Sequence, residues 1–299
     1  MKAFYCDQIR FPIPEGHRFP TLKFPLLRQA VVEAGLVAPE DLRVPEPATV
    51  EQILRAHDAD YLRRLVAGQL SAQEVRRIGL PWSAELVQRA RCSAGGTIAA
   101  SRAALQDGIA VNLGGGTHHA SCDRGQGYCL LNDSVIAARA MQAEGLARRA
   151  VVLDCDVHQG NGTAAIAAGD PTIFTFSIHS EENFPLHKAP SDLDVGLESG
   201  AGDEVYLEAL QDGLEQALTR ARADLAIYLA GADPYEGDML GRLALTKAGL
   251  AQRDRLVLKR CRGEGIPVVV VMAGGYARHV QDAVEIHLQT VRLAAEMAA

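Results

Sequence analysis

The segment VVLDCDVHQGNG, residues 151–162, ends an apolar run with two aspartates and a histidine at alternate positions. Burying a carboxylate is costly unless a cation or several hydrogen-bond donors compensate its charge. Because side chains alternate between the two faces of a strand, we expect Asp154, Asp156 and His158 on one side, with Cys155 pointing the other way. Asp156 and His158 could then bind one metal ion, with Asp154 behind them as a hydrogen-bond acceptor.

A third metal ligand should come from another strand end, and Asp233 in GADPYEGD is the best placed. Two carboxylates, one neutral imidazole and an open coordination position suit a divalent ion that activates water. The alternative is that these residues only form turns and helix caps, since Asp233-Pro234 and Asn161-Gly162 are common turn pairs. Polar residues gathered at neighbouring strand ends favour the metal site.

Two adjacent histidines, His118 and His119, follow three glycines in GGGTHHASCDRGQGYC. Glycines permit tight turns and close approach of a substrate or metal, whereas the Lys-Ser/Thr pair of a phosphate-binding P-loop is missing. Adjacent histidines can be simple surface residues. Beside a metal, however, one of them can take a proton from the attacking water. Asp154 and Asn161 are available acceptors to orient the two rings.

Aromatic residues complete the candidate site. Tyr276 in AGGYARH follows the last predicted strand, and its hydroxyl can donate to a developing oxyanion, although packing in a core or rim is the commoner role of tyrosine. Tyr128 and Phe184 are candidates for the walls of a substrate channel, and core packing is an equally good interpretation of each. We place Gly127 and Leu240 in the same channel.

The elements that must position these residues alternate along most of the chain. Apolar runs without polar alternation are typical of strands covered on both faces, and strands that alternate with helices indicate a parallel sheet between two helical layers. The sequence therefore predicts one α/β domain over residues 1–299. Predicted strands are 2–5, 109–113, 150–155, 172–177, 225–230 and 267–272, and predicted helices are 24–34, 49–54, 83–106, 132–144, 203–222, 247–262 and 278–296.

Ligands of open parallel sheets bind beyond the carboxyl ends of the strands. Four polar motifs stand there: HHASCD, DVHQGNG, GADPYEGD and AGGYARH. Their convergence indicates one shared site more strongly than any single motif does.

Composition limits the classes of function. The chain is 48% hydrophobic and 22% charged, as expected of a globular protein, and its net charge of -7 argues against direct binding of nucleic acid. No apolar stretch has the length of a membrane span or the pattern of a signal peptide, so we expect a cytoplasmic protein. The six cysteines form no C-x-x-C pair, which favours free thiols over a structural zinc site.

Five motifs in order, GGGTHHA, GYCLLND, VVLDCDVHQGNG, GADPYEGD and AGGY, resemble the zinc-dependent histone deacetylase superfamily over residues 90–280. HQGNG, GADPYEGDMLG and LTKAGLAQRD are most similar to the class IV branch and its bacterial relatives. This resemblance implies an arginase/deacetylase-like fold and hydrolysis of an acyl-lysine amide.

The resemblance also implies a role for each site residue. Asp156, His158 and Asp233 would bind Zn²⁺, and His119 would be the general base and acid. His118, supported by Asp154, would be its electrostatic companion, and Tyr276 would polarise the amide carbonyl. A K⁺ or Na⁺ ion would lie near the zinc, partly on backbone oxygens, at Asp154, Asp156, His158, Ser177 and Ile178.

Two departures from the family pattern concern Asn161, where many deacetylases have an aspartate paired with the second histidine, and Ala273, where many have glycine. The amide of Asn161 lacks a charge that would raise the basicity of His119.

Several alternatives stay open at this point. The substrate could be an acyl-lysine protein or peptide, carrying acetyl or a longer fatty acyl group, or a small amide such as an acetylpolyamine. An arginase-like two-metal hydrolase and a catalytically silent binding module are further possibilities. Iron or cobalt could occupy the same ligands. The sequence predicts no oligomeric state.

Overall fold

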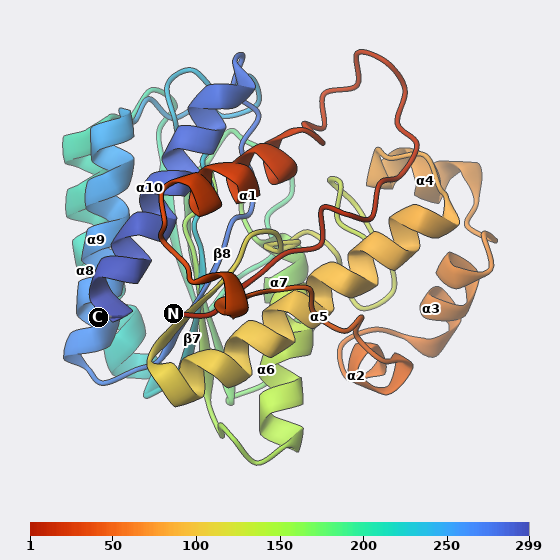
Figure 1. Cartoon of the computed structure of the whole chain (residues 1–299), viewed down its shortest axis with the longest axis horizontal. Helices are drawn as coiled ribbons and strands as arrows, with labels where there is room; N and C mark the ends of the chain where they lie inside the picture. Colours follow the sequence, from red (N-terminus) through yellow and green to blue (C-terminus); the bar gives the residue numbers. More distant parts are fainter. Residues whose placement is uncertain (299) are drawn as a thin grey trace.

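A parallel sheet lies between two layers of helices in the computed structural model, which describes residues 1–298 (Figure 1). Its eight strands follow the order β2-β1-β3-β8-β7-β4-β5-β6, and every neighbouring pair is parallel. The strands are β1 (Ala3–Phe4), β2 (Leu42–Arg43), β3 (Ile109–Asn112), β4 (Ala150–Asp154), β5 (Ile173–Ser180), β6 (Leu193–Leu197), β7 (Leu225–Leu229) and β8 (Val268–Val271).

Helices cover both faces of the sheet, as the sequence predicted. Side chains from α1, α8, α9 and α10 form a core on one face, and side chains from α2, α3, α5 and α6 form a core on the other. The helices are α1 (Lys23–Glu33), α2 (Val50–Leu54), α3 (Ala59–Val66), α4 (Ala72–Ile78), α5 (Ala84–Asp107), α6 (Asp133–Ala143), α7 (Asn161–Ala167), α8 (Asp203–Ala221), α9 (Lys247–Gly263) and α10 (Val280–Ala298), with a 3₁₀ helix at Pro39–Asp41.

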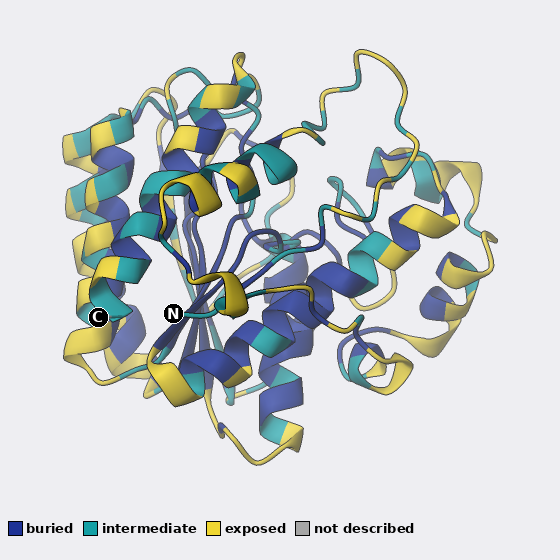
Figure 2. Ribbon diagram, viewed as in Figure 1, coloured by how far each residue is buried: buried dark blue, intermediate teal, exposed yellow. Residues whose placement is uncertain are grey.

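Alternate residues of one strand enter opposite cores. Val268 and Val270 of β8 pack with α8 to α10, whereas Val269 and Val271 pack on the side of α5 and α6. Figure 2 shows the consequence, because the central strands β3, β8, β7 and β4 are buried along their whole length, whereas the exposed residues gather on the outer faces of the helices and in the loops. Burial on both faces explains why the strand sequences are continuous apolar runs.

The sequence missed five helices and strands, besides the 3₁₀ helix. Three are β2, α3 and α4, all within the first 80 residues. The capping box of α4, in which Ser71 and Glu74 exchange hydrogen bonds, is nevertheless a helix-start signal. The edge strand β6 was missed because its side chains are mostly not buried, so it lacks an apolar run. The pair Asn161-Gly162 is a turn signal in the sequence, but in the structure Asn161 begins the fifth missed element, α7. No helix in the described part of the chain could span a membrane.

Candidate active site

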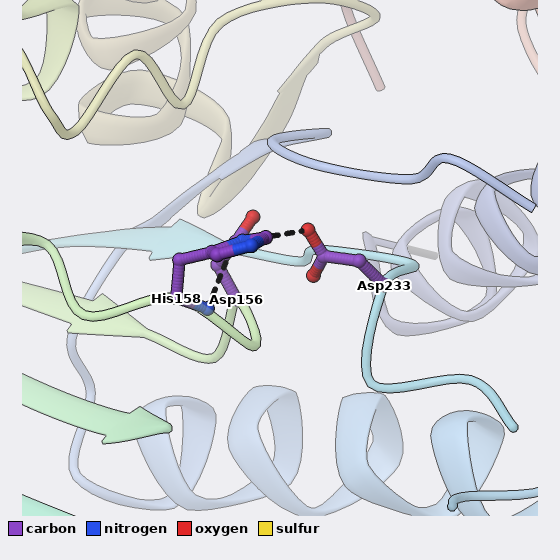
Figure 3. A group of neighbouring side chains, drawn as sticks. All are labelled: Asp156, His158 and Asp233. Carbon is purple, nitrogen blue, oxygen red and sulfur yellow. Dashed lines mark hydrogen bonds and ion pairs between the residues drawn. The ribbon is translucent and has the colours of Figure 1, made fainter. Parts of the chain in front are cut away.

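Three candidate metal ligands converge from two neighbouring strand ends. Asp156 and His158 lie in bends after β4, and Asp233 lies in a turn after β7, the strand beside β4 (Figure 3). The Nδ1 atom of His158 lies 3.0 Å from Oδ1 of Asp156 and 3.4 Å from Oδ2 of Asp233. All three side chains are buried, and a ligand atom from each lies within 4.8 Å of the others.

One detail of the prediction is wrong. Because β4 ends at Asp154, strand alternation does not place Asp156 and His158 on one face with it. The chain bends after the strand instead, and hydrogen bonds fix the bends: the backbone N–H of Asp156 donates to Oδ1 of Asp154, and that of His158 donates to Oδ1 of Asp156. Cys155 does point away, into the hydrophobic core.

Hydrogen bonds orient the carboxylates of Asp156 and Asp233, but one of their oxygens has no hydrogen-bond partner. Backbone N–H groups of Val157 and Gly274 donate to Oδ1 of Asp233 (2.9 Å) and Oδ2 of Asp156 (2.8 Å). Oδ2 of Asp233 is buried and has no hydrogen-bond partner, which is costly unless a cation accepts its charge. A Cβ at position 274 would collide with both carboxylates, so only glycine fits.

Burial and the nearby Asp156 carboxylate raise the pKa of Asp233 to about 7. A divalent cation between the two carboxylates would relieve their repulsion. Two carboxylates and an imidazole match a zinc site with an open position. Among residues 1–298, this is the one group of at least three acidic, histidine or cysteine side chains close enough to hold an ion. The described residues thus contain one candidate ion site.

The tandem histidines have different partners. Nδ1 of His118 lies 2.6 Å from Oδ2 of Asp154, and Nδ1 of His119 lies 2.8 Å from Oδ1 of Asn161, the first residue of α7. The rings of His118 and His119 are 4.1 Å apart between centroids, and the ring of His119 is 5.8 Å from that of His158. Each partner fixes the orientation of a ring beside the candidate metal site.

The pKa values of the two histidines shift in opposite directions. Burial lowers the pKa of His118, but the carboxylates of Asp154 and Asp156 outweigh this and raise it to about 9. Burial lowers the pKa of His119 well below its usual value, and the charges of His118 and His158 add to the effect. At neutral pH the first histidine is thus charged and the second neutral, the state that a general base requires.

Tyr276 faces the same site from the loop after β8. Burial and the carboxylates of Asp156 and Asp233 raise the pKa of its hydroxyl well above the usual value, so it stays a hydrogen-bond donor. Its backbone N–H donates to Oδ2 of Asp238 at 2.6 Å. Oδ1 of Asp238 accepts from the backbone of Leu240 and Gly241, so this aspartate joins the two loops. We missed Asp238, although GADPYEGD contains it.

A cavity of about 490 Å³ opens onto these groups. Its lining includes the four predicted channel residues, which are Gly127, Tyr128, Phe184 and Leu240. The ring of Phe184 meets His119 edge-on at 4.9 Å, and a Cβ at Gly127 would lie 2.6 Å from the His119 ring. The sequence did not identify the apolar side chains that extend the cavity, which are Phe11, Phe19, Phe24, Leu80 and Leu86.

Lys23 of α1 is a further cavity residue that the sequence did not single out. It is 3% exposed, its Nζ donates to the carbonyl of Ala273 at 3.1 Å, and it lies 6.0 Å from the centre of the Tyr276 ring. Burial lowers the pKa of Lys23 to about 8, although the carboxylates of Asp233 and Asp156 oppose the shift. Within residues 1–298 no carboxylate lies close enough to form an ion pair with it.

Ala273 departs from the glycine of the family pattern in a strained position. Its φ of 50° lies in the left-handed region that favours glycine.

The residues expected around a monovalent cation are all buried. Asp154 pairs with Ser177 in the register of β4 and β5, and Asp156, His158 and Ile178 complete the set. That cation stays a prediction.

Comparisons with known proteins point to one family. A family profile described as "Histone deacetylase domain" matches residues 17–291. An uncharacterized protein of Picosynechococcus sp. is 48% identical over 92% of both chains. Histone deacetylase 2 of Arabidopsis thaliana is 30% identical over 91% of this chain and 74% of its own length. A histone deacetylase-like amidohydrolase of Pseudomonas aeruginosa is 32% identical over 89% of this chain and 74% of its own.

Among solved structures, an HDAC homolog from Aquifex aeolicus superimposes with a TM-score of 0.82 at 21% identity, covering 99% of this chain and 83% of its own. This likeness supports the fold, and the sequence relatives support the family. With its candidate Asp-His-Asp metal site and parallel α/β sheet, the chain belongs to the histone deacetylase family.

Proposed function

We propose that this protein is a zinc-dependent amidohydrolase that removes acyl groups from the ε-amine of lysine in proteins or peptides. The buried cluster of Asp156, His158 and Asp233 carries the proposal, because it brings three potential ligands together, includes a carboxylate oxygen without a hydrogen-bond partner, and reaches the cavity through Asp156 and His158. A bound divalent ion would supply polarisation of the amide carbonyl and activation of water. The likeness to class IV deacetylases, the neighbouring K⁺ or Na⁺ ion and the single-domain organisation over residues 1–299 belong to the same proposal.

His119 is the proposed general base and acid. Its Nδ1–H donates to the amide oxygen of Asn161, which leaves the Nε2 lone pair free to accept a proton from the attacking water. The same nitrogen then returns the proton to the leaving lysine amine. His118, held charged by Asp154, stabilises negative charge that develops on the substrate.

Tyr276 is the proposed donor to the developing oxyanion. Its hydroxyl remains protonated at neutral pH, and Asp238 fixes its backbone relative to the loop after β7. Gly127, Tyr128, Phe184 and Leu240 would enclose the lysine side chain and exclude water from the reacting amide.

The cavity supports acyl groups longer than acetyl. Its volume of about 490 Å³ lies within the range of pockets for whole small molecules, which is roughly 300–1,000 Å³. An acetyl group adds only three heavy atoms to the lysine side chain that shares this cavity, which leaves space for a longer acyl chain. The apolar rings of Phe11, Phe19 and Phe24 suit a hydrocarbon chain rather than a polar acyl group.

The test is turnover of one lysine peptide carrying a series of acyl groups from acetyl to long fatty acyl, together with an acetylpolyamine, with metal analysis on the same sample. We expect hydrolysis of at least one acyl-lysine peptide and about one zinc ion per chain. Turnover of only the acetylpolyamine would assign the small-amide alternative. A zinc-loaded protein that hydrolyses none of these substrates would refute the amidohydrolase proposal.

A further inference from the structure

A fully buried arginine lies behind the candidate metal site, outside the cavity. Arg253 of α9 is 0% exposed. Its Nη1 donates to the backbone carbonyl of Gly231 at 2.5 Å and to that of Cys155 at 3.3 Å. One guanidinium nitrogen therefore joins the chain segments that follow β7 and β4.

These two carbonyls belong to the segments that carry the candidate metal ligands. Cys155 directly precedes Asp156, and Gly231 is two residues before Asp233. A Cβ at position 231 would lie 2.8 Å from the Cα of Asp156, so the two segments touch. The hydrogen bonds of Arg253 thus act on the backbone where the separation of the two carboxylates is set.

The guanidinium is itself held in place by a hydrogen-bonded carboxylate. Nε and Nη2 of Arg253 lie 2.9 Å and 2.8 Å from Oδ1 of Asp254. The hydroxyl of Tyr228 on β7 donates to Oδ1 of Asp254 at 2.5 Å, and that of Thr290 on α10 donates to Oδ2 at 2.6 Å. Asp254, the carboxylate partner of the arginine, is thus tied to the sheet and to a second helix.

Buried ion pairs are a weak source of stability, because desolvating both charges offsets most of their attraction. Apolar side chains of similar volume would serve a hydrophobic core as well or better. A guanidinium, however, can bind two carbonyls in a fixed geometry while it pairs with a carboxylate. The contacts with the two ligand-bearing segments give this pair a role that apolar packing cannot fill.

We propose that Arg253 is a positioning residue of the metal centre, which holds the turns carrying Asp156 and Asp233 at the separation that one divalent ion requires. Asp254, Tyr228 and Thr290 fix its orientation. This inference rests on the metal site of the proposed function but on no step of the reaction. Residues that orient metal ligands typically change metal affinity by roughly 10–100-fold when they are replaced.

Zinc affinity, measured by competition with a chelator, tests the proposal without any substrate. Arg253→Met should weaken zinc binding roughly 10–100-fold. Arg253→Lys keeps a charge beside Asp254 but loses the forked geometry, so it should bind zinc with intermediate affinity. The lysine variant carries the test alone if the methionine variant does not fold.

Arg139→Met is a matched control for a merely structural role. Arg139 also donates to two backbone carbonyls, of Arg55 and Ile166, and pairs with Asp170, but none of these belongs to the metal site. This control should lower the unfolding temperature of the metal-free protein and leave the zinc dissociation constant unchanged.

Two outcomes would overturn the inference in distinguishable ways. If wild-type protein binds zinc and both Arg253 variants bind it equally well, Arg253 does not position the ligands, and the proposed function is unaffected. If the wild-type protein itself binds no zinc, the metal centre of the proposed function is wrong, and the role of Arg253 is wrong with it.

Discussion

The Nδ1 atom of His119 lies 2.8 Å from the Oδ1 atom of Asn161, so the second histidine of the tandem pair is oriented by a neutral amide. The first histidine, His118, is oriented by the carboxylate of Asp154. An amide oxygen fixes the tautomer of an imidazole as well as a carboxylate does, but it stabilises the imidazolium less. At neutral pH His118 is therefore protonated, and only His119 is in the neutral form that can accept a proton.

Asn161→Asp should shift the pH dependence of hydrolysis. A carboxylate beside His119 would raise its pKa by on the order of one unit. Because a base must be unprotonated to act, the acidic limb of the kcat/KM profile should move to higher pH by a similar amount. An unchanged acidic limb in this variant would show that His119 is not the group that titrates.

Tyr276→Phe should lower kcat by roughly 10²–10³-fold, because it removes one donor to the oxyanion, while zinc content stays unchanged. Tyr128→Phe is the matched control, since it removes a hydroxyl from the same cavity, 5.8 Å from Tyr276 between ring centroids, but keeps the ring that we place at the channel wall. Equal activity of wild type and Tyr276→Phe would instead favour a protein that only binds acylated ligands.

Asp233→Asn should abolish stoichiometric zinc binding and, with it, hydrolysis. In the metal-free protein, the same substitution should instead become favourable for stability as pH rises. The folded-state pKa of Asp233 is raised to about 7 from an ordinary value of 3.8, so its contribution to stability is lost as pH rises through this interval. The unfolding temperature of the Asp233→Asn variant, relative to that of metal-free wild type, should therefore increase from pH 4 to 7. A constant difference over this range would contradict the assignment.

Lys23→Met should stabilise the protein at neutral pH, because it removes a buried charge that has no carboxylate partner within residues 1–298. The folded-state pKa of about 8 is below the ordinary 10.5, so wild type regains stability as pH rises from 8 to 10.5, and the advantage of the variant should shrink there. Lys247→Met is the contrast, since Lys247 pairs with Asp282 and Glu285 at 2.6 Å. It should not stabilise the protein at pH 7.

Ala90→Phe should alter the choice of acyl group. Ala90 of α5 lines the cavity, and a phenyl ring there would fill space that a long chain needs. We expect a loss of at least tenfold in kcat/KM for a long-chain acyl-lysine peptide, with little change for acetyl-lysine, which serves as the internal control. Equal losses on both substrates would place the acyl chain elsewhere.

The sequence by itself predicted the interior strands of the sheet and most of the candidate site residues. Apolar runs fixed the interior strands, and parallel strands bring their carboxyl ends to one edge. The motifs after β3, β4, β7 and β8 had to meet there, because these four strands are consecutive in the sheet. This is why Asp156, His158, Asp233, the two histidines and Tyr276 could be named from local patterns.

Tertiary structure alone decided which residues support and surround them. Lys23 contacts Ala273, 250 residues away, and Arg253 contacts Cys155 across 98 residues. Neither side chain stands in a local pattern that distinguishes it from an ordinary helical residue. Their roles arise only when α1 and α9 pack against the sheet, since burial makes a lone charge or an unpaired carbonyl costly and so selects its partner.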